Sequence, residues 1–300
     1  MADGGGRLYV SDLDGTLLRN DATVSEFSCR HLNELINRGM QFTVASARSV
    51  VSMGYVLRGV RIALPVIEFN GAFISDLQTG YHHVVNSIAR DTVDELYGLI
   101  LRQGMRPFVS CVDDTQDDLL FYDEAINEGM QRHVDEKLRM ADRRLRRTDA
   151  LHETLLYRVV CLTVMDRRGP LEALLAEIVQ TCRGSIEPHL FENPYQAGWY
   201  WLTLHDTKAT KDQAIRALAE NFGIAASQLT VFGDHMNDLG MFRIASHAVA
   251  VGNAKEELKQ HATCVIGTNE EDSVVRYLVE HSGLGDLEQV DAAPHRPHPL

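Results

Sequence analysis

The sequence has little of what marks several classes of protein. Its cysteines are few, odd in number and scattered without a C-x-x-C pair, so they predict reduced thiols rather than a disulfide framework or a zinc site (Cys29, Cys111, Cys161, Cys182 and Cys264). No apolar run approaches the roughly 18 to 20 residues of a membrane helix. The opening stretch MADGGGRLYV lacks the basic and apolar segments of a signal peptide. These absences predict a cytoplasmic protein without a membrane partner.

Basic residues are also scarce. The 42 Asp and Glu outnumber the 29 Lys and Arg, which gives a formal net charge of −13. Because nucleic-acid binding relies on Lys and Arg that neutralise phosphates, we expect no nucleic-acid partner. A small anionic substrate remains possible if local positive groups or a metal hold it. The 300 residues, 45% of them apolar, suffice for one large domain or two ordinary ones.

The first third alternates short apolar strands with helical patterns. A strand at RLYVSD precedes a helix that Ser25 can cap, and a second strand lies at MQFTVASAR. A third strand, LPVIEFNGAFIS, runs into the turn dipeptide Asn70-Gly71 and a partner strand. Strand–helix–strand repetition predicts a Rossmann-like parallel sheet covered by helices, an α/β fold.

The middle of the chain has a different pattern. From about Ser87, paired strands joined by polar turns predict an antiparallel sheet with helices on one side, and the α/β pattern returns at WYWLTLH. We therefore predict a discontinuous core domain of residues 1–84 and 197–283. An α+β domain of residues 85–196 is inserted into it, and a flexible tail spans residues 284–300.

Four polar motifs follow predicted strand ends or a helix start, where open α/β sheets bind ligands. The first is Asp12-x-Asp14 in VSDLDGTLL, followed by Gly15, which permits a sharp turn. Residues two apart on an extended chain face the same side. Two carboxylates about 4 Å apart repel by about 1 kcal/mol in water and about 4 kcal/mol at an effective dielectric constant near 20. A cation or a shared proton relieves this repulsion, although a plain acidic corner is the alternative.

The second and third motifs carry a hydroxyl and an ammonium group. Ser46 in TVASAR can donate to an anion or be an ordinary loop serine, and the role of Arg48 stays open. Lys211 stands at a predicted helix start, where the helix dipole disfavours a cation, so a bound anion would explain it. Lys208 is a competitor, and a solvated lysine is the alternative.

The fourth motif is GDHMND, which follows a predicted strand. Asp234 and Asp238 lie four residues apart, so like charges would repel on one helical face unless a cation intervenes. Asn237 adds a neutral donor and acceptor, and a polar loop with a helix cap is the alternative. Together the four motifs favour Mg²⁺ bound by carboxylates, and they suggest phosphoryl transfer.

With these motifs the sequence resembles the haloacid dehalogenase superfamily of phosphatases. DLDGTLL is similar to its first motif, Ser46 to the second, Lys211 to the third and GDHMND to the fourth. The inserted domain, FNGAFIS and AVAVGNAKEELKQHA resemble the Cof-type subgroup, subfamily IIB, with its larger C2-type cap. The resemblance covers about residues 7 to 280, and the cap resembles that of the family only in architecture.

The resemblance implies a role for each matching residue. Asp12 would be the nucleophile that forms an aspartyl-phosphate, and Asp14 would act first as an acid and then as a base. The phosphoryl oxygens would be held by Ser46, Lys211 and Asn237. Mg²⁺ would be held by the Asp12 carboxylate, the Asp14 carbonyl and Asp234, with Asp238 in direct contact or one layer further out.

Three positions depart from the family pattern. His235 and Asp212 stand where glycine is usual or frequent, and Ser46 replaces a more usual threonine. None of these changes removes a catalytic group. We read His235 as an ordinary loop residue or as a substrate contact.

The prediction is a Mg²⁺-dependent phosphatase of a small phosphorylated metabolite, such as a sugar phosphate or a cofactor-type phosphate. A phosphomutase could share all four motifs, and a non-enzymatic phosphate-binding regulatory module is a third possibility. The aromatic stretch PYQAGWYW could line the site or pack a domain junction. The basic stretch KLRMADRRLRR, predicted to be helical, could attract anions or face solvent. The sequence names no specificity residue and no oligomeric state.

Overall fold

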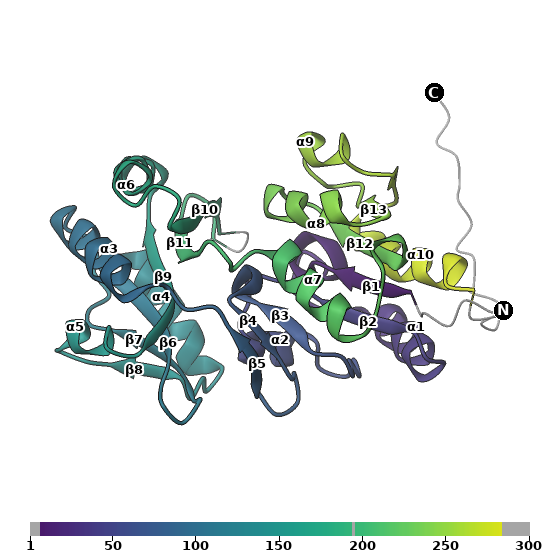
Figure 1. The fold of residues 1–300 in the computed structure, drawn as a ribbon, viewed down its shortest axis with the longest axis horizontal. Helices are drawn as coiled ribbons and strands as arrows, with labels where there is room; N and C mark the ends of the chain where they lie inside the picture. Colours follow the sequence, from purple (N-terminus) through teal and green to yellow (C-terminus); the bar gives the residue numbers. More distant parts are fainter. Residues whose placement is uncertain (1–6, 194–195, 284–300) are drawn as a thin grey trace.

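The computed structural model describes residues 7–193 and 196–283, which form two lobes (Figure 1). The predicted flexible tail, residues 284–300, lies outside the described residues, as does the Pro194-Tyr195 pair of the aromatic stretch. None of the described helices combines the length and the apolar character that crossing a membrane requires.

The first lobe is built on a five-stranded parallel sheet, in the order β14-β13-β12-β1-β2. Its strands are β1 (Leu8–Ser11), β2 (Gln41–Val44), β12 (Leu229–Gly233), β13 (His247–Ala250) and β14 (Cys264–Val265). From β1 the chain moves to β2 on one side, whereas from β12 it moves through β13 to β14 on the other side. This reversal makes the β1–β12 junction the switch point of the sheet, where ligands of such folds bind. The predicted parallel α/β core is confirmed.

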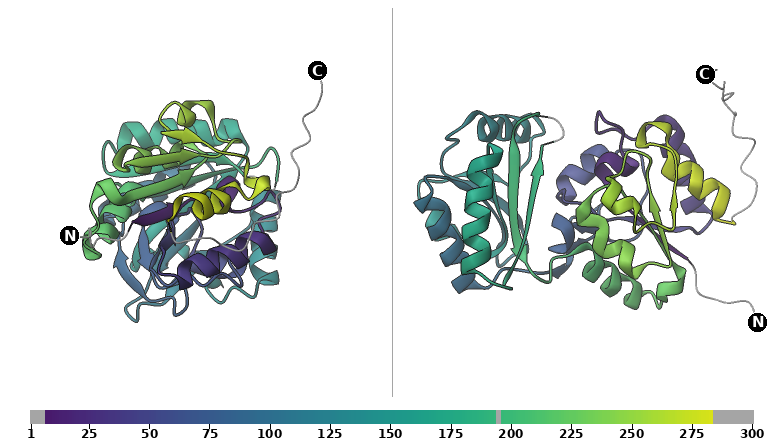
Figure 2. Two further views of the ribbon diagram at one scale, coloured as in Figure 1. Left: turned by 90° about the vertical axis from the view of Figure 1, so that its right-hand side faces the viewer. Right: turned by 90° about the horizontal axis from the view of Figure 1, so that it is seen from above.

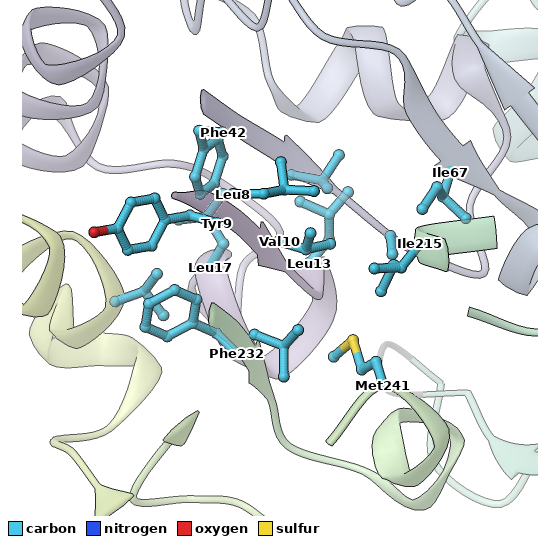
Figure 3. Close-up of a cluster of buried hydrophobic side chains, with 14 of the residues drawn as sticks. Leu8, Tyr9, Val10, Leu13, Leu17, Phe42, Ile67, Ile215, Phe232 and Met241 are labelled. Carbon is cyan, nitrogen blue, oxygen red and sulfur yellow. The ribbon is translucent and has the colours of Figure 1, made fainter. Parts of the chain in front are cut away.

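Helices cover this sheet: α1 (Glu26–Asn37), α2 (Val50–Val56), α7 (Lys211–Asn221), α8 (Leu239–Ile244), α9 (Glu256–Lys259) and α10 (Ser273–His281). Ser25 caps α1, as predicted, by accepting a hydrogen bond of 2.9 Å from the Ser28 amide. Helix α1 packs against α10, and α7 against α8. The central strand β1 is buried throughout, and Figure 3 shows its side chains beside Phe42, Phe232 and Ile215. This burial fixes the strand whose end carries the first motif.

A small antiparallel sheet borders the parallel one. It contains β3 (Val66–Glu68), β4 (Phe73–Ser75) and β5 (His82–Val85), and a bridge between Ala45 and Ile67 joins it to the end of β2. The predicted Asn70-Gly71 turn lies between β3 and β4. At Gly71, where φ is +116°, a Cβ atom would lie 2.5 Å from the Thr210 carbonyl oxygen. The turn therefore packs directly against the residue that precedes α7.

The second lobe contains a six-stranded sheet in the order β10-β11-β9-β6-β7-β8. Its strands are β6 (Pro107–Val112), β7 (Asp118–Tyr122), β8 (Leu145–Arg147), β9 (Arg158–Asp166), β10 (Ile186–Glu192) and β11 (Tyr200–Asp206). All pairs are antiparallel except β7–β8. The predicted inserted α+β lobe with an antiparallel sheet is therefore confirmed.

The prediction that helices lie on one side of the second sheet is wrong, because helices lie on both of its faces. Helices α3 (Arg90–Arg102) and α6 (Arg168–Thr181) pack on the face that points away from the first lobe (Figure 2). Helix α4 (Glu128–Arg139) packs on the other face, where Met130 and Val134 contact Phe108 and Met165. A short helix, α5 (Leu151–Thr154), precedes β9.

The predicted return to the core domain at residue 197 is wrong. Strand β11 pairs with β9 and β10, so the second lobe continues to Asp206 and the chain re-enters the first lobe through residues 207–210. The error has a physical reason, because an apolar strand shows the same alternation in either sheet. Only its pairing register assigns it to one of them.

The basic stretch that was predicted as one long helix is divided. Helix α4 ends at Arg139, Ala141 has a φ of +50°, and the last residues form β8. A left-handed residue such as Ala141 ends a helix, and helical periodicity alone does not reveal it.

Candidate active site

The four sequence motifs meet at the carboxyl edge of the parallel sheet. Asp12 directly follows β1 and Asp234 directly follows β12, on either side of the switch point. The Asp12 amide donates a hydrogen bond of 2.9 Å to the Phe232 carbonyl, which continues the pairing of the two strands. One carboxylate oxygen each from Asp12, Asp234 and Asp238 lies within 4.8 Å of the others. Acids from opposite ends of the chain therefore converge on one point.

Lys211 is the cation of this cluster. It is the first residue of α7 and only 2% exposed. Its Nζ atom donates to Asp12 Oδ1 at 2.5 Å and to Asp238 Oδ1 at 2.7 Å. The two carboxylates offset the unfavourable position of a lysine at a helix N-terminus. Lys208, the predicted competitor, is exposed and lies outside the cluster.

Asp238 organises the loop that follows β12. Its Oδ2 atom accepts hydrogen bonds from the backbone amides of Asp234 at 2.9 Å and His235 at 3.1 Å. Since Oδ1 is bound to Lys211, both oxygens of Asp238 are already engaged by protein donors. His235 has a φ of −126°, a conformation that needs no glycine, and burial lowers the pKa of its imidazole.

Asp234 packs against the turn of the first motif. Its Oδ1 atom accepts a hydrogen bond of 3.1 Å from the Thr16 hydroxyl. Gly15 has a φ of +78°, and a Cβ atom there would lie 2.5 Å from Asp234 Oδ2. Glycine is needed at this position for both reasons, since a side chain would strain the turn and displace the carboxylate.

The cluster holds more negative charge than Lys211 can balance. Burial raises the pKa of Asp12 well above its usual value, and Lys211 only partly opposes this shift. Burial, together with Asp238, raises the pKa of Asp234 to about 7. Burial alone would lower the pKa of Lys211, but Asp12 and Asp238 reverse that shift and keep the ammonium protonated. Carboxylate oxygens are the preferred ligands of hard divalent cations, so this group of acids could hold a metal ion.

Arg48, whose role the sequence left open, is bound to Asp14. Its Nε and Nη2 atoms donate to the two carboxylate oxygens of Asp14, both at 2.7 Å. Its Nη1 atom donates to the Ser52 hydroxyl at 2.9 Å. This two-point contact fixes the plane of the Asp14 carboxylate, which a single point charge would not do.

Ser46 and Asn237 lie beside the acids and share a link that the sequence did not suggest. The Ser46 hydroxyl, 1% exposed, accepts a hydrogen bond of 3.1 Å from the Arg48 amide, so its own proton remains available for a ligand. Asn237 Nδ2 donates to Asn70 Oδ1 at 3.2 Å. The Asn70 amide in turn donates to the Ser46 carbonyl at 2.9 Å. The Asn-Gly dipeptide was predicted only as a turn, and both residues have the positive φ that this pair of residue types tolerates.

All seven predicted site residues except Asp238 line one cavity of about 1510 Å³ between the two lobes. Arg144 links the lobes beside it, because its Nη2 atom donates to the Ser49 hydroxyl at 2.7 Å. Arg144 itself is buried and paired with Asp118 at 2.8 Å and Asp142 at 2.7 Å. A smaller cavity, of about 680 Å³ near Ser87 and Asp206, contains none of the predicted site residues.

The fold and this cluster define a class of α/β enzymes that work at an aspartate-rich centre beneath an inserted lobe. Residues 9–278 match the family described as haloacid dehalogenase-like hydrolase. The chain therefore belongs to the haloacid dehalogenase-like hydrolases, and the resemblance predicted from its motifs is confirmed.

Individual relatives match over nearly their whole length. The chain is 25% identical over 282 residues to the 5-amino-6-(5-phospho-D-ribitylamino)uracil phosphatase YitU of Bacillus subtilis, covering 92% of this chain and 98% of that one. It is 25% identical to the HMP-PP phosphatase of Yersinia enterocolitica, over 91% and 94% of the two chains. A haloacid dehalogenase-like hydrolase from Bacteroides thetaiotaomicron has the same fold, with a TM-score of 0.75 and 23% identity over 91% of this chain and 98% of that chain.

Proposed function

We propose that the protein is a Mg²⁺-dependent phosphatase that hydrolyses a small phosphorylated metabolite through an aspartyl-phosphate on Asp12. The observation that carries the proposal is the convergence of three acids within 4.8 Å, two of them paired with a buried lysine. The names of the Bacillus and Yersinia relatives support the substrate class, because both describe phosphatases of small metabolites.

The donors of the cluster suit Mg²⁺. The Asp12 and Asp234 carboxylates and the Asp14 carbonyl would hold the ion. Asp238 would not coordinate the ion directly, because both of its oxygens already accept hydrogen bonds from protein donors. When bound, Mg²⁺ neutralises charge on the phosphoryl oxygens and on the attacking carboxylate.

The residues of the chain perform the remaining work in two halves. The Ser46 hydroxyl, the Lys211 ammonium and the Asn237 amide bind and orient the phosphoryl oxygens. A carboxylate oxygen of Asp12 attacks phosphorus, a new P–O bond forms, and the bond from phosphorus to the leaving oxygen breaks. A covalent intermediate divides one difficult displacement into two easier ones.

Asp14 moves the proton in both halves. It first protonates the leaving oxygen, and the resulting carboxylate then removes a proton from the water that attacks the aspartyl-phosphate. Inorganic phosphate leaves, and Asp12 and Asp14 return to their starting states. Arg48 fixes the orientation of the Asp14 carboxylate through its paired contacts of 2.7 Å.

The test is phosphate release from a panel of sugar phosphates, nucleotides and cofactor phosphates. We expect turnover with Mg²⁺, its loss with EDTA and its return when Mg²⁺ is added in excess. A phosphorylated Asp12 should be trapped and located by mass spectrometry. The proposal fails if the whole panel is inert with Mg²⁺, and isomerised sugar phosphate without free phosphate would indicate a phosphomutase instead.

A further inference from the structure

The wall of the cavity opposite the acids is the face of the second sheet that α3 and α6 leave uncovered. Strand register places four residues in one row across β6, β9, β11 and β10, with Phe108 beside Thr163, Thr163 beside Thr203, and Thr203 beside His189. Their strand neighbours Leu162 and Leu204 pack into the apolar cluster of α3 and α6 on the other face. The row lines the same cavity as Asp12 and Lys211.

Two polar atoms in this row lack a hydrogen-bond partner in the part of the chain that the structure describes. Thr203 is 6% exposed, and its Oγ1 atom has no hydrogen-bond partner among the described residues. The Nε2 atom of His189 also has no hydrogen-bond partner within the described chain. Thr163 Oγ1 has the Cys161 sulfur, a weak partner, at 3.4 Å. Buried polar atoms are normally satisfied, so groups left unpaired on a cavity wall point to a ligand.

His133 extends the row from α4. It is 8% exposed, and Nδ1 has no partner in the part of the chain that the structure describes. Its ring lies edge-to-face against Phe108 and Trp201, with both centroid distances at 5.0 Å. Among the described aromatic residues of the predicted stretch, Trp201 lines the cavity. The buried Trp199 instead packs against Gly129 and Arg167 within the second lobe.

The polar side chains of the row are uncharged. Burial lowers the pKa of His133 well below its usual value and that of His189 to about 4, so both imidazoles are uncharged at pH 7. The buried cations nearby are committed to carboxylates, since Arg144 is paired with Asp118 and Asp142 and Lys137 lies 3.9 Å from Asp142.

The other charges on the second-lobe side do not offer an anion a buried site. Glu187, one row along β10 from His189, lines the cavity, and burial raises the pKa of its carboxyl. Arg132 and Arg139 of α4 line the cavity as exposed side chains, and so do Arg243 and Lys255 of the first lobe, while Arg48 is paired with Asp14. A second anionic group at the row would therefore lose its hydration without gaining a buried cation.

We propose that Thr163, Thr203, His189 and His133 select the leaving group of the substrate, and that this group is uncharged and carries several hydroxyls. The hydroxyls bond to the unpaired polar atoms of the row, while the carbon skeleton packs on Phe108 and Trp201. The inference rests on the proposed phosphatase activity and narrows its substrates to phosphate monoesters of neutral polyols and sugars. Esters whose leaving group bears a carboxylate or a second phosphate are selected against.

Matched substrates test the charge rule. Glucitol 6-phosphate and gluconate 6-phosphate differ by a hydroxymethyl group in place of a carboxylate, and acetyl phosphate has a leaving group without a hydroxyl. We expect kcat/KM for glucitol 6-phosphate to exceed that for gluconate 6-phosphate by about tenfold or more, the effect of one buried unpaired polar mismatch. Equal values, or a preference for the charged member, overturn the inference while acetyl phosphate hydrolysis still supports the phosphatase. If none of the three compounds is hydrolysed and the substrate panel is also inert, the proposed phosphatase activity itself is wrong.

Variants test the residues. Thr203→Val and Thr163→Val should each raise KM for glucitol 6-phosphate, relative to that for acetyl phosphate, about three- to tenfold, with a smaller change in kcat. Thr203→Ser keeps the hydroxyl, so its KM for glucitol 6-phosphate should stay close to that of the wild type. Thr230→Val is the matched control, because Thr230 is 1% exposed, its Oγ1 atom lacks a partner among the described residues, and it lies on β12 away from the cavity. If Thr203→Val and Thr230→Val change the KM ratio equally, the row does not select the substrate.

Discussion

The two walls of the cavity differ in the charge of their buried polar side chains. On the first-lobe wall, charged side chains are bonded to one another, as in the contacts of Lys211 with Asp12 and Asp238. On the second-lobe wall, the side chains of the row across β6, β9, β11 and β10 are neutral, and Thr203 has an unpaired hydroxyl within the described chain. A buried charge requires a protein partner even when no ligand is bound. A neutral hydroxyl can stay unpaired in the free protein at a cost of about 1–3 kcal/mol and bond to a ligand later.

This difference separates two tasks of the proposed enzyme. The paired charges are organised in advance, so they can serve the same chemistry on any phosphate ester. The unpaired neutral groups interact only with a leaving group that matches them, so they can discriminate between esters. Substitutions on the first wall should therefore lower activity on all substrates, and substitutions on the second wall should change the order of preference.

The largest effect is expected for Asp12→Asn. The amide keeps the size of the side chain but is a poor nucleophile, so kcat should fall by about 10³-fold or more on every substrate. Phosphate release and trapping of the phosphorylated protein are the measurements. Asp113→Asn, at an exposed turn of the second lobe, is the control and should leave both unchanged. An Asp12→Asn variant that retains wild-type turnover would falsify the assigned nucleophile.

Lys211→Met should have the next largest effect. It removes the cation between Asp12 and Asp238 while filling similar space, so kcat should fall by about 10²–10³-fold, as when one charge-stabilising donor is lost. The buried carboxylates left behind should also lower the melting temperature in EDTA. Mg²⁺ should recover part of that temperature, since it supplies the missing positive charge. Lys208→Met, at an exposed position in the preceding loop, should change neither quantity. Unaltered melting in EDTA would show that the buried pairs are not needed for stability.

The same contrast explains what the sequence could predict. The first wall comes from short motifs in which charge, spacing and strand ends coincide, so the sequence alone predicts its seven proposed site residues. Parallel strands bring their carboxyl ends to one edge, which is why Asp12 and Asp234 could be expected to meet.

The second wall could not be predicted in this way. Its row takes one residue from each of four strands, and only strand register brings Thr163 and Thr203 together. The misplaced boundary at 197 removed β11, and Thr203 with it, from the second lobe. Contacts between long side chains were also hidden, as with Arg48, because the sequence does not show which carboxylate a guanidinium will reach.

A smaller effect on the first wall is expected for Arg48→Lys. Lysine keeps the charge but loses the paired contacts to Asp14, so the carboxylate should become mobile. We expect kcat to fall about tenfold with little change in KM. Arg38→Lys, in a surface pair with Glu34, is the control. A loss confined to KM would instead place Arg48 in substrate binding.

The smallest effect tests the neutrality of the second wall through the pH dependence of stability. Burial lowers the pKa of His205 to about 3, with a further contribution from His189. In the unfolded chain a histidine takes up a proton below about pH 6.5, so between pH 6.5 and 3 the unfolded state binds more protons than the folded state. The contribution of His205 is therefore nearly complete above about pH 7 and is lost as the pH falls, by about 1.6 kcal/mol between pH 6.5 and 5.

Urea denaturation at pH 6.5 and 5 measures this loss. His205→Gln cannot take up the proton, so its stability should decline less than that of the wild type over this interval, whatever its absolute value. His247→Gln, at an exposed position at the start of β13, should decline as the wild type does. If the His205→Gln variant declines as steeply as the wild type, this buried imidazole is not held neutral. The second wall would then not be neutral, because it would lie close to a buried positive charge that favours an anionic leaving group.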